Sequence, residues 1–141
     1  MIGVAKRLES GKSFGIDIWN QEDLSNNSVE NALKNARVED VIGKVEIKNE
    51  DVRKMSFSDA FFDVVISNLC LHNIYDEEGR TQACREIARV LKPGGQVVIS
   101  DFRHTKEYAD ELQKHGIKVH LSKPLFFSTF PPLRIVEGRK I

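Results

Sequence analysis

The sequence predicts an α/β fold, in which a doubly wound and mostly parallel sheet is formed by a single domain over residues 1–141. Two short apolar segments rich in β-branched residues, Val64–Ile66 and Val97–Ile99, are separated by about thirty residues of helical character. Such a pair reads as one βαβ unit with both strands buried, as in a parallel sheet covered on both faces. Strand-like and helix-like segments alternate along most of the remaining chain, which favours right-handed crossovers in one sheet.

The first half of the chain supplies two of these strands. Met1–Leu8 has the spacing of the last turns of a helix and is followed by a glycine stop. A short strand over Ser13–Ile18 and an alternating strand from Val45 come next, and a helix with apolar spacing from Val29 to Ala36 lies between them. The candidates for the cap of that helix are Asn26, Asn27 and Ser28.

The second half contains the buried unit and two terminal strands. Asp76 can cap a helix that Lys92–Gly95 would stop, since proline cannot continue a helix and glycine tolerates positive φ. The predicted elements here are a strand over Phe62–Ser67, that helix, a strand over Gln96–Ser100, a helix over Thr105–Lys114, and strands over Lys118–Leu121 and Leu133–Glu137. We expect the last two strands to form an antiparallel hairpin.

Composition argues against several classes of partner. Lys+Arg and Asp+Glu number 21 each, so no overall field attracts nucleic acid or an anionic membrane. No run approaches eighteen apolar residues, and the first residues have too short an apolar core for a signal peptide. The two cysteines, Cys70 and Cys84, lack metal-ligand spacing, which predicts buried free thiols, no metal and a cytoplasmic protein. The oligomeric state has no sequence signal.

Polar side chains follow three of the predicted strands. Asp17, Asp51 and Asn68 each stand where a strand ends. In an open α/β sheet, ligands bind beyond the carboxyl ends of the strands, so this edge is the predicted site. A carboxylate can accept two charge-assisted hydrogen bonds from vicinal hydroxyls, which suits a nucleotide ribose. An acid at a strand end also suits the ribose of a nicotinamide cofactor, so Asp17 alone does not name the nucleotide.

Four segments together resemble the class I S-adenosylmethionine-dependent methyltransferases, in particular their small-molecule, UbiE/type 11-like branch. The most specific is EIARVLKPGGQVVISDF, a helix–LKPGG–strand run that recurs in this family and seldom elsewhere. The others are FGIDIW, NEDVRKMSF and FFDVVISNLCLHNI. The resemblance covers nearly all of residues 15–116 and implies a Rossmann-like methyltransferase fold with S-adenosylmethionine as cofactor.

The resemblance also implies roles for residues at the strand ends. Asp17 would hold the ribose hydroxyls, Asp51 would meet the adenine amine, and the methionine part would lie near Asn68. The apolar neighbours expected to flank the cofactor are Ile18, Trp19, Val52 and Leu69. His72 follows a strand exit and is the candidate catalytic base, against the alternative of a structural histidine. Asp101 and His104 follow the next exit and either line the acceptor pocket or cap the helix near Thr105.

One part of the family pattern is absent. The first strand and its glycine-rich DxGxGxG loop do not precede Met1, and Lys92–Gly95 is not that loop. The resemblance would place this strand centrally, so the chain reads as an N-terminally truncated fold. A native or ancestral product with roughly 40–60 further N-terminal residues is expected, the size of a strand–loop–helix unit.

The predicted function is therefore S-adenosylmethionine-dependent methyl transfer to a small-molecule acceptor. A non-catalytic methyltransferase-like remnant or interaction module is the first alternative, and the absent glycine loop favours it. A nicotinamide-dependent oxidoreductase is the second, but it needs a glycine-rich fingerprint of its own and LKPGG does not suit it. The acceptor cannot be derived from the residues.

Overall fold

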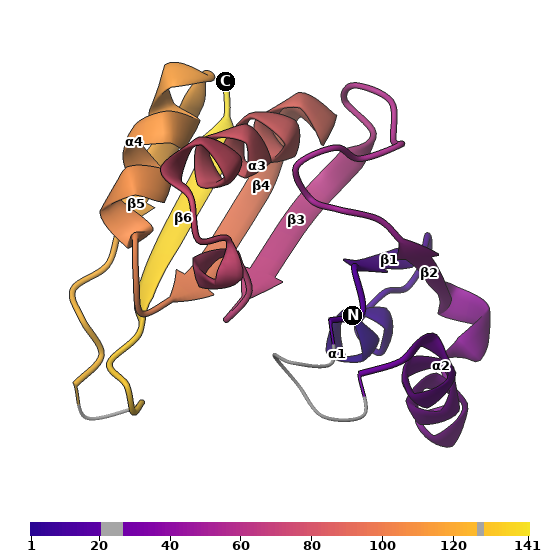
Figure 1. The fold of residues 1–141 in the computed structure, drawn as a ribbon. Coiled ribbons are helices and arrows are strands. Elements are labelled where there is room, and N and C mark those ends of the chain that lie inside the picture. Colours follow the sequence, from indigo (N-terminus) through magenta and orange to yellow (C-terminus); the bar gives the residue numbers. More distant parts are fainter. Residues whose placement is uncertain (21–26, 127–128) are drawn as a thin grey trace. The chain divides into compact units, whose positions relative to one another are not determined.

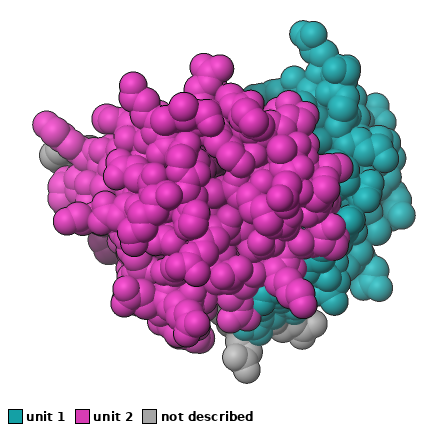
Figure 2. Space-filling model, turned by 90° about the horizontal axis from the view of Figure 1, so that it is seen from above, with its two compact units in different colours: residues 1–51 teal, residues 52–141 magenta. Residues whose placement is uncertain are grey.

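The computed structural model describes residues 1–20, 27–126 and 129–141. The chain forms two compact units, residues 1–51 and residues 52–141, which have separate colours in Figure 2. Each unit has its own sheet (Figure 1). A single domain over residues 1–141 stays a prediction.

The first unit is a pair of parallel strands with short helices. Its elements are α1 (Ile2–Ala5), β1 (Ser13–Asp17), α2 (Val29–Val38), the 3-10 turn η1 (Ile42–Lys44) and β2 (Val45–Asn49). The strands are in parallel register, with Asp17 opposite Asn49, so both end at the same edge. A small core of Ala5, Ala36 and Val41 fills the unit.

Helix α2 begins where the polar cluster predicts. The side chain of Ser28 accepts a hydrogen bond of 3.2 Å from the backbone N–H of Asn31. This cap satisfies one of the amide groups that a helix start leaves without an intrahelical partner. Of the other two cap candidates, Asn27 bonds elsewhere and Asn26 lies outside the described residues.

The second unit is a four-stranded mixed sheet covered by two helices. Its strands have the spatial order β3–β4–β6–β5, and the β3–β4 pair is parallel whereas the other pairs are antiparallel. Helices α3 and α4 lie on one face of this sheet (Figure 1). The bounds are β3 (Phe62–Asn68), the 3-10 turn η2 (Leu71–Asn73), α3 (Glu77–Val90), β4 (Leu91–Asp101), α4 (Thr105–Lys114), β5 (Ile117–Leu121) and β6 (Arg134–Lys140). This arrangement confirms the α/β class and the antiparallel pairing of the last two strands.

The boundary between α3 and β4 differs from the prediction. Asp76 caps α3 as expected, accepting from the backbone N–H of Gly79, but the helix ends at Val90 and the strand begins at Leu91. Leu91 already pairs with Phe62, and the next matched pair is Val64 with Gln96. The LKPGG run is therefore an irregular part of β4, and Gly94 at φ +77 supplies the turn that a side chain would hinder.

The prediction that both central strands are buried on both faces is wrong, because Gln96 of β4 is exposed and Val98 only half-buried on the face away from the helices. Strand β4 is buried toward the helices through Val97 and Ile99. On β3, Val64 is 49% and Ile66 is 53% exposed. Strand β3 is the edge of its sheet, and α3 and α4 cover only the other face (Figure 1). The apolar sequence of β3 is that of an interior strand, which is why its pattern predicted burial.

The two thiols also differ. Cys84 is buried on α3, as predicted, whereas Cys70 is exposed after β3, contrary to the prediction.

Among the helices that the structure describes, none combines the length and the hydropathy needed to cross a membrane.

Candidate functional site

Asp17 stands at the end of β1, where its carboxylate organises the turn that follows. Oδ1 accepts a hydrogen bond of 2.6 Å from the backbone N–H of Trp19, and the Asn27 side-chain amide donates to both oxygens at 3.3 Å. A carboxylate has about four acceptor positions, so hydrogen-bonding capacity remains for further donors. The residue is half-buried, and its hydrogen bonds fix the direction of the carboxylate.

The residues after Asp17 present apolar surface next to that carboxylate. Ile18 is 57% exposed, and Trp19 adopts the left-handed conformation with φ 56. The indole Nε1 of Trp19 is buried and has no hydrogen-bond partner among the described residues. A positive φ at a bulky residue is uncommon and marks a constrained turn.

The end of β2 lies beside that of β1. The backbone N–H of Glu50 donates to the carbonyl oxygen of Asp17 at 3.2 Å, which extends the pairing by one step beyond Asn49. Asp51 follows directly and is half-buried, as is Val52. The first unit therefore brings Asp17 and the segment that leads to Asp51 to one edge of the β1–β2 sheet. Val52 begins the second unit.

In the second unit, Asn68 ends β3 and is exposed. Leu69 continues the pairing, because its backbone N–H donates to the carbonyl oxygen of Ser100 at 2.9 Å, and it has a φ of 50. Its side chain is 42% exposed. Both residues thus lie at the carboxyl edge of the sheet with accessible side chains.

His72 is joined to the end of the neighbouring strand by a buried carboxylate. Its ring Nδ1 lies 2.8 Å from Oδ1 of Asp101, whose side chain is fully buried. The distance is that of an ion pair, but Nδ1 has no hydrogen-bond partner among the described residues.

Asp101 is held by backbone amides as well. Oδ2 accepts from the backbone N–H of His72 at 3.2 Å, and Oδ1 accepts from that of Phe102 at 2.8 Å. The Phe102 ring lies with its centroid 4.5 Å from that of His72. Asp101 therefore ties the segment after β3 to the end of β4, which neither of its predicted roles describes.

A buried phenol lies near this pair. Tyr108 of α4 is fully buried, and its hydroxyl has no hydrogen-bond partner among the described residues. Burial, with the nearby charge of Asp101, raises the pKa of the Tyr108 phenol, so the group stays neutral.

The prediction that Asp101 or His104 caps the helix near Thr105 is wrong. His104 occupies the position before α4 but makes no side-chain cap bond, and Asp101 lies further back.

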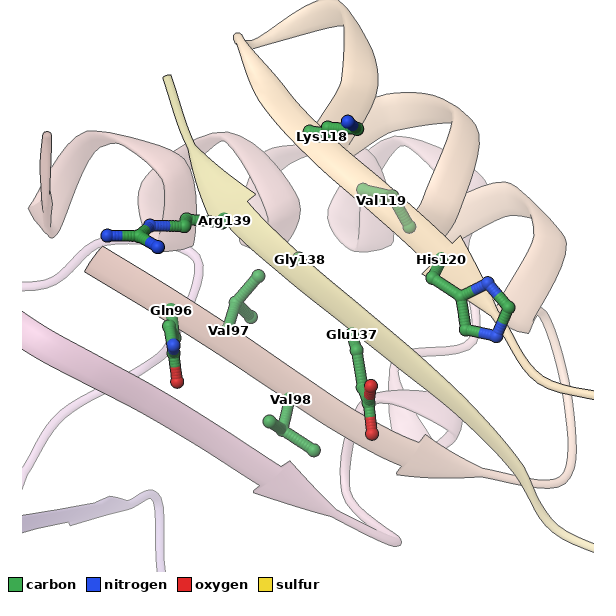
Figure 3. A pocket seen from close by; sticks show the side chains of 9 residues that line it. All are labelled: Gln96, Val97, Val98, Lys118, Val119, His120, Glu137, Gly138 and Arg139. Carbon is green, nitrogen blue, oxygen red and sulfur yellow. The ribbon is translucent and has the colours of Figure 1, made fainter. Parts of the chain in front are cut away.

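A shallow hollow of about 480 Å³ lies elsewhere, on the sheet face opposite the helices (Figure 3). The side chains of Gln96, Val98 and Glu137 stand on this face. Since β4 runs from Leu91 to Asp101, the hollow is at the middle of the strand and not at its carboxyl end. The strand-end residues, and not this hollow, carry the chemistry described above.

The pairing of His72 with Asp101 is the feature that sequence reasoning missed. Both residues were noted as followers of strand exits, but separately. The signal available was the adjacency of the two strands in the predicted βαβ unit, which brings their ends together.

Comparison with known proteins identifies the family. The profile described as "Methyltransferase domain" matches residues 6–99, which is two thirds of the chain. The C-methyltransferase UbiE of ubiquinone and menaquinone biosynthesis from Vibrio campbellii is 30% identical over 92 residues, covering 65% of this chain and 34% of that protein. The 27-O-demethylrifamycin SV methyltransferase of Amycolatopsis mediterranei is 37% identical over 79 residues, covering 56% and 28%. The chain spans about a third of the length of such relatives.

Solved structures share the fold at low sequence identity. The [4+2]-cyclase SpnF superposes with a TM-score of 0.78 at 17% identity, covering 99% of this chain and 69% of that chain. A SAM-dependent methyltransferase from Aquifex aeolicus gives 0.72 at 18% identity, covering 99% and 74%. At such identities the likeness establishes the fold and not the reaction.

Proposed function

Because the chain belongs to the methyltransferase-domain family, we propose that it acts in S-adenosylmethionine-dependent methyl transfer to a small-molecule acceptor. The observation that carries the proposal is Asp17, a carboxylate fixed at the end of a parallel strand within the matched region. The named relatives include a C-methyltransferase and an enzyme of rifamycin methylation, which supports a small organic acceptor.

Residues at strand ends are the proposed contacts of the cofactor. Asp17 would accept hydrogen bonds from the ribose hydroxyls. Its carboxylate is oriented by the donors it already has, and both oxygens keep lone pairs for further donors. Ile18 and Trp19 would flank the adenine, with Asp51 as acceptor for its amine and Val52 against the ring. Asn68 and Leu69 would lie near the methionine part.

When bound, the cofactor supplies a methyl group on a sulfonium, which is already activated for displacement. The protein then has to position the acceptor in line with the methyl–sulfur bond and to exclude water. The polar groups at the strand ends fix orientation, and apolar neighbours such as exposed Leu69 provide surface for burial.

Titration of S-adenosylhomocysteine in a calorimeter tests this proposal. We expect saturable binding, and Asp17→Ala should weaken it by at least about tenfold, or about 1.4 kcal/mol. The matched control is Glu46→Ala, because Glu46 is another acid of the first unit but lies near the start of β2 and faces Lys12. An unchanged affinity in Asp17→Ala would refute its ribose role, and absence of heat at about 1 mM ligand would refute cofactor binding by this chain.

Two other functions give different outcomes in the same experiment. A non-catalytic methyltransferase-like remnant or interaction module is the first alternative, and the exposed apolar side chains of edge strand β3 favour it. It predicts no heat with either nucleotide. A nicotinamide-dependent oxidoreductase predicts heat with NADH and none with S-adenosylhomocysteine. The cyclase among the structural neighbours illustrates that this fold also serves other chemistry.

The cellular setting is part of the proposal. A cytoplasmic protein that meets a small-molecule substrate, without nucleic acid or membrane partners, agrees with the balanced charge of the sequence.

A further inference from the structure

We propose that the face of the second unit's sheet that lies opposite α3 and α4 is a docking surface for a second copy of this chain. The proposal goes beyond the proposed function and does not depend on cofactor binding. It stands on the side chains of this face, which carry charges of both signs in an order that a two-fold axis makes complementary.

This face combines apolar and charged side chains, and both kinds are exposed. Side chains alternate between the two faces along a strand, so the neighbours of buried Val97 on β4 stand on the face away from the helices (Figure 3). On β3, Val64 and Ile66 are about half exposed. Lys118 of β5 and Glu137 of β6 are exposed as well. An exposed apolar patch bordered by polar residues is typical of an interaction surface.

The strand pairing arranges these side chains in two rows that cross the sheet, each with one member on β3, β4, β6 and β5. The first row is Val64, Gln96, Arg139 and Lys118, and the second is Ile66, Val98, Glu137 and His120. Figure 3 shows the members from β4, β6 and β5. The positive charges of the first row therefore stand beside the negative charge of the second.

The charged side chains of this face are not neutralised within the described part of the chain. Lys118 and Arg139 lie directly opposite each other in the β5–β6 pairing, where like charges repel. Arg139 donates from Nε to the carbonyl oxygen of Gly94 at 3.1 Å. The side chains of Lys118 and Glu137 have no hydrogen-bond or ion-pair partner among the described residues. Charges supplied by another molecule would compensate both signs.

A second copy supplies those charges if the two-fold axis lies parallel to the sheet, across the strands and between the two rows. Each row then faces the other row of the partner, as a self-complementary interface requires. Arg139 faces the partner's Glu137, and Val64 faces the partner's Ile66. Such an axis keeps the strands of the two sheets nearly aligned, which is a common arrangement when sheets pack face to face.

The mixture of charges is what favours a second copy over other occupants. A uniformly acidic partner would suit Lys118 and Arg139 but would place a like charge against Glu137. A uniformly basic partner would have the opposite conflict. Complementary charges across an interface give specificity and fix its register, and here one chain supplies both halves.

The size of the face predicts a weak dimer. Four strands about 4.8 Å apart, each contributing about six residues of 3.4 Å, cover roughly 400 Å² of flat area. A standard interface buries about 800 Å² of accessible surface on each partner. We therefore expect a reversible dimer with a dissociation constant on the order of 10–100 µM.

Analytical ultracentrifugation of the full chain measures this equilibrium, over about 5 to 500 µM so that the expected constant is bracketed. We expect the mass to rise with concentration from 16.0 kDa toward twice that value. A chain that stays monomeric throughout would overturn the proposal and leave this face to a partner of another sequence. Salt screens exposed charge pairs, so raising NaCl from about 0.05 to about 0.5 M should weaken the dimer several-fold. A dimer that salt leaves unchanged or strengthens would overturn the charge pairing without any variant.

Charge reversal locates the interface. Glu137→Arg and Arg139→Glu should each weaken the dimer by at least about tenfold, because like charges would then face each other across the axis. Asp110→Arg is the matched control, since Asp110 is an exposed acid on α4, on the other side of the sheet, and its reversal should leave the equilibrium unchanged. Circular dichroism checks that each variant is folded. A dimer that Glu137→Arg leaves intact would overturn the assignment of this face.

An equimolar mixture of the two charge-reversed chains tests the axis itself. In a heterodimer of Glu137→Arg with Arg139→Glu, both charge pairs are restored in reversed order. We expect the mixture to dimerise with an affinity within about threefold of the unmodified chain, although each variant alone is monomeric at the same concentration. A mixture that remains monomeric would overturn the two-fold arrangement.

Discussion

Arg80 is the side chain whose replacement should destabilise the second unit most clearly. Its guanidinium donates to both carboxylate oxygens of Glu107, from Nε at 2.9 Å and from Nη2 at 3.0 Å. Nη1 donates to the carbonyl oxygens of Ile74 and Tyr75 at 3.0 and 2.8 Å. The side chain is only 6% exposed. Arg80 thus joins α3, α4 and the loop before α3.

The substitution Arg80→Met keeps an unbranched apolar stem and removes all four hydrogen bonds. Removal of one partner from a buried ion pair costs about 3–5 kcal/mol, since it leaves an uncompensated charge. The Glu107 side chain is 26% exposed, so water can solvate it in part. We therefore expect a loss near the lower limit, about 3 kcal/mol in the free energy of unfolding.

Arg85→Met is the matched control on the same helix. Arg85 also bonds a glutamate of α4, Glu111, but through Nε alone at 3.2 Å, and its side chain is 53% exposed. An exposed pair contributes up to about 1 kcal/mol. Both variants lose an ion pair between α3 and α4. A difference between their losses of unfolding free energy therefore reports on burial and on the number of hydrogen bonds.

Urea unfolding followed by circular dichroism gives both free energies, and hydrogen exchange of the residue 77–90 peptides locates the loss in α3. The expected order is a large loss for Arg80→Met and a small one for Arg85→Met. Equal losses of unfolding free energy in the two variants, or a loss below about 1 kcal/mol for Arg80→Met, would refute the view that buried Arg80 holds α3, α4 and the preceding loop together.

Three further results are expected. Bonds from Lys114, His115 and Arg85 lower the pKa of Glu111 from 4.5 to about 2, so this carboxylate stabilises the fold above pH 4.5 and the stability is lost as pH falls from 4.5 toward 2. The pKa difference corresponds to about 3 kcal/mol, and because Lys114 is exposed we expect about 1–2 kcal/mol of stability. A urea midpoint that falls no more with acid in wild type than in Glu111→Gln would contradict this. Burial raises the pKa of the Cys84 thiol to about 12. A thiol reagent at neutral pH should therefore label Cys70, whereas Cys84 should react about a thousandfold more slowly than a free cysteine. Mass spectrometry of the labelled peptides measures both rates, and comparable labelling of the two would show that Cys84 is accessible. Gly138→Ala should cost about 1–3 kcal/mol in urea unfolding, because its Cβ would lie 2.5 Å from Cγ2 of Ile117, whereas Gly43→Ala has open space and should be near neutral.

Local features of the fold were predictable because their causes are local. Asp76 caps α3 and Ser28 caps α2, as a short polar side chain before an apolar-periodic run predicts. Strands β3 and β4 were located from their β-branched runs, and the family match supports the methyltransferase resemblance read from the LKPGG segment. These signals lie within a few residues of the structure that they specify.

Features that depend on pairing between distant segments were not predictable. The LKPGG segment reads as a helix stop, but Leu91 already pairs with Phe62, so the segment is part of β4. The exposure of Ile66 depends on which strands and helices meet β3, and the residue itself carries no such information.

The candidate site divides in the same way. A polar residue at a strand end can be located from the sequence, so Asp17, Asn68 and His72 could all be named. The partner of His72 could not, because the contact with Asp101 depends on the parallel register of β3 and β4 across 29 residues of chain. The cofactor roles of the strand-end residues stay predictions.

The strand order of the second unit has a consequence for folding during synthesis. Strand β6 follows β5 in the chain but lies between β4 and β5, so β5 has no sheet partner until β6 has been made. Contacts between segments distant in sequence slow folding. A ribosome that has released β5 but not β6 therefore holds the β3–β4 pair with one edge of β4 still unpaired, the kind of intermediate that chaperones protect. Completion of this sheet awaits Arg134–Lys140, and Lys140 then also bonds the carbonyl oxygens of Ala88 and Leu91 at the end of α3.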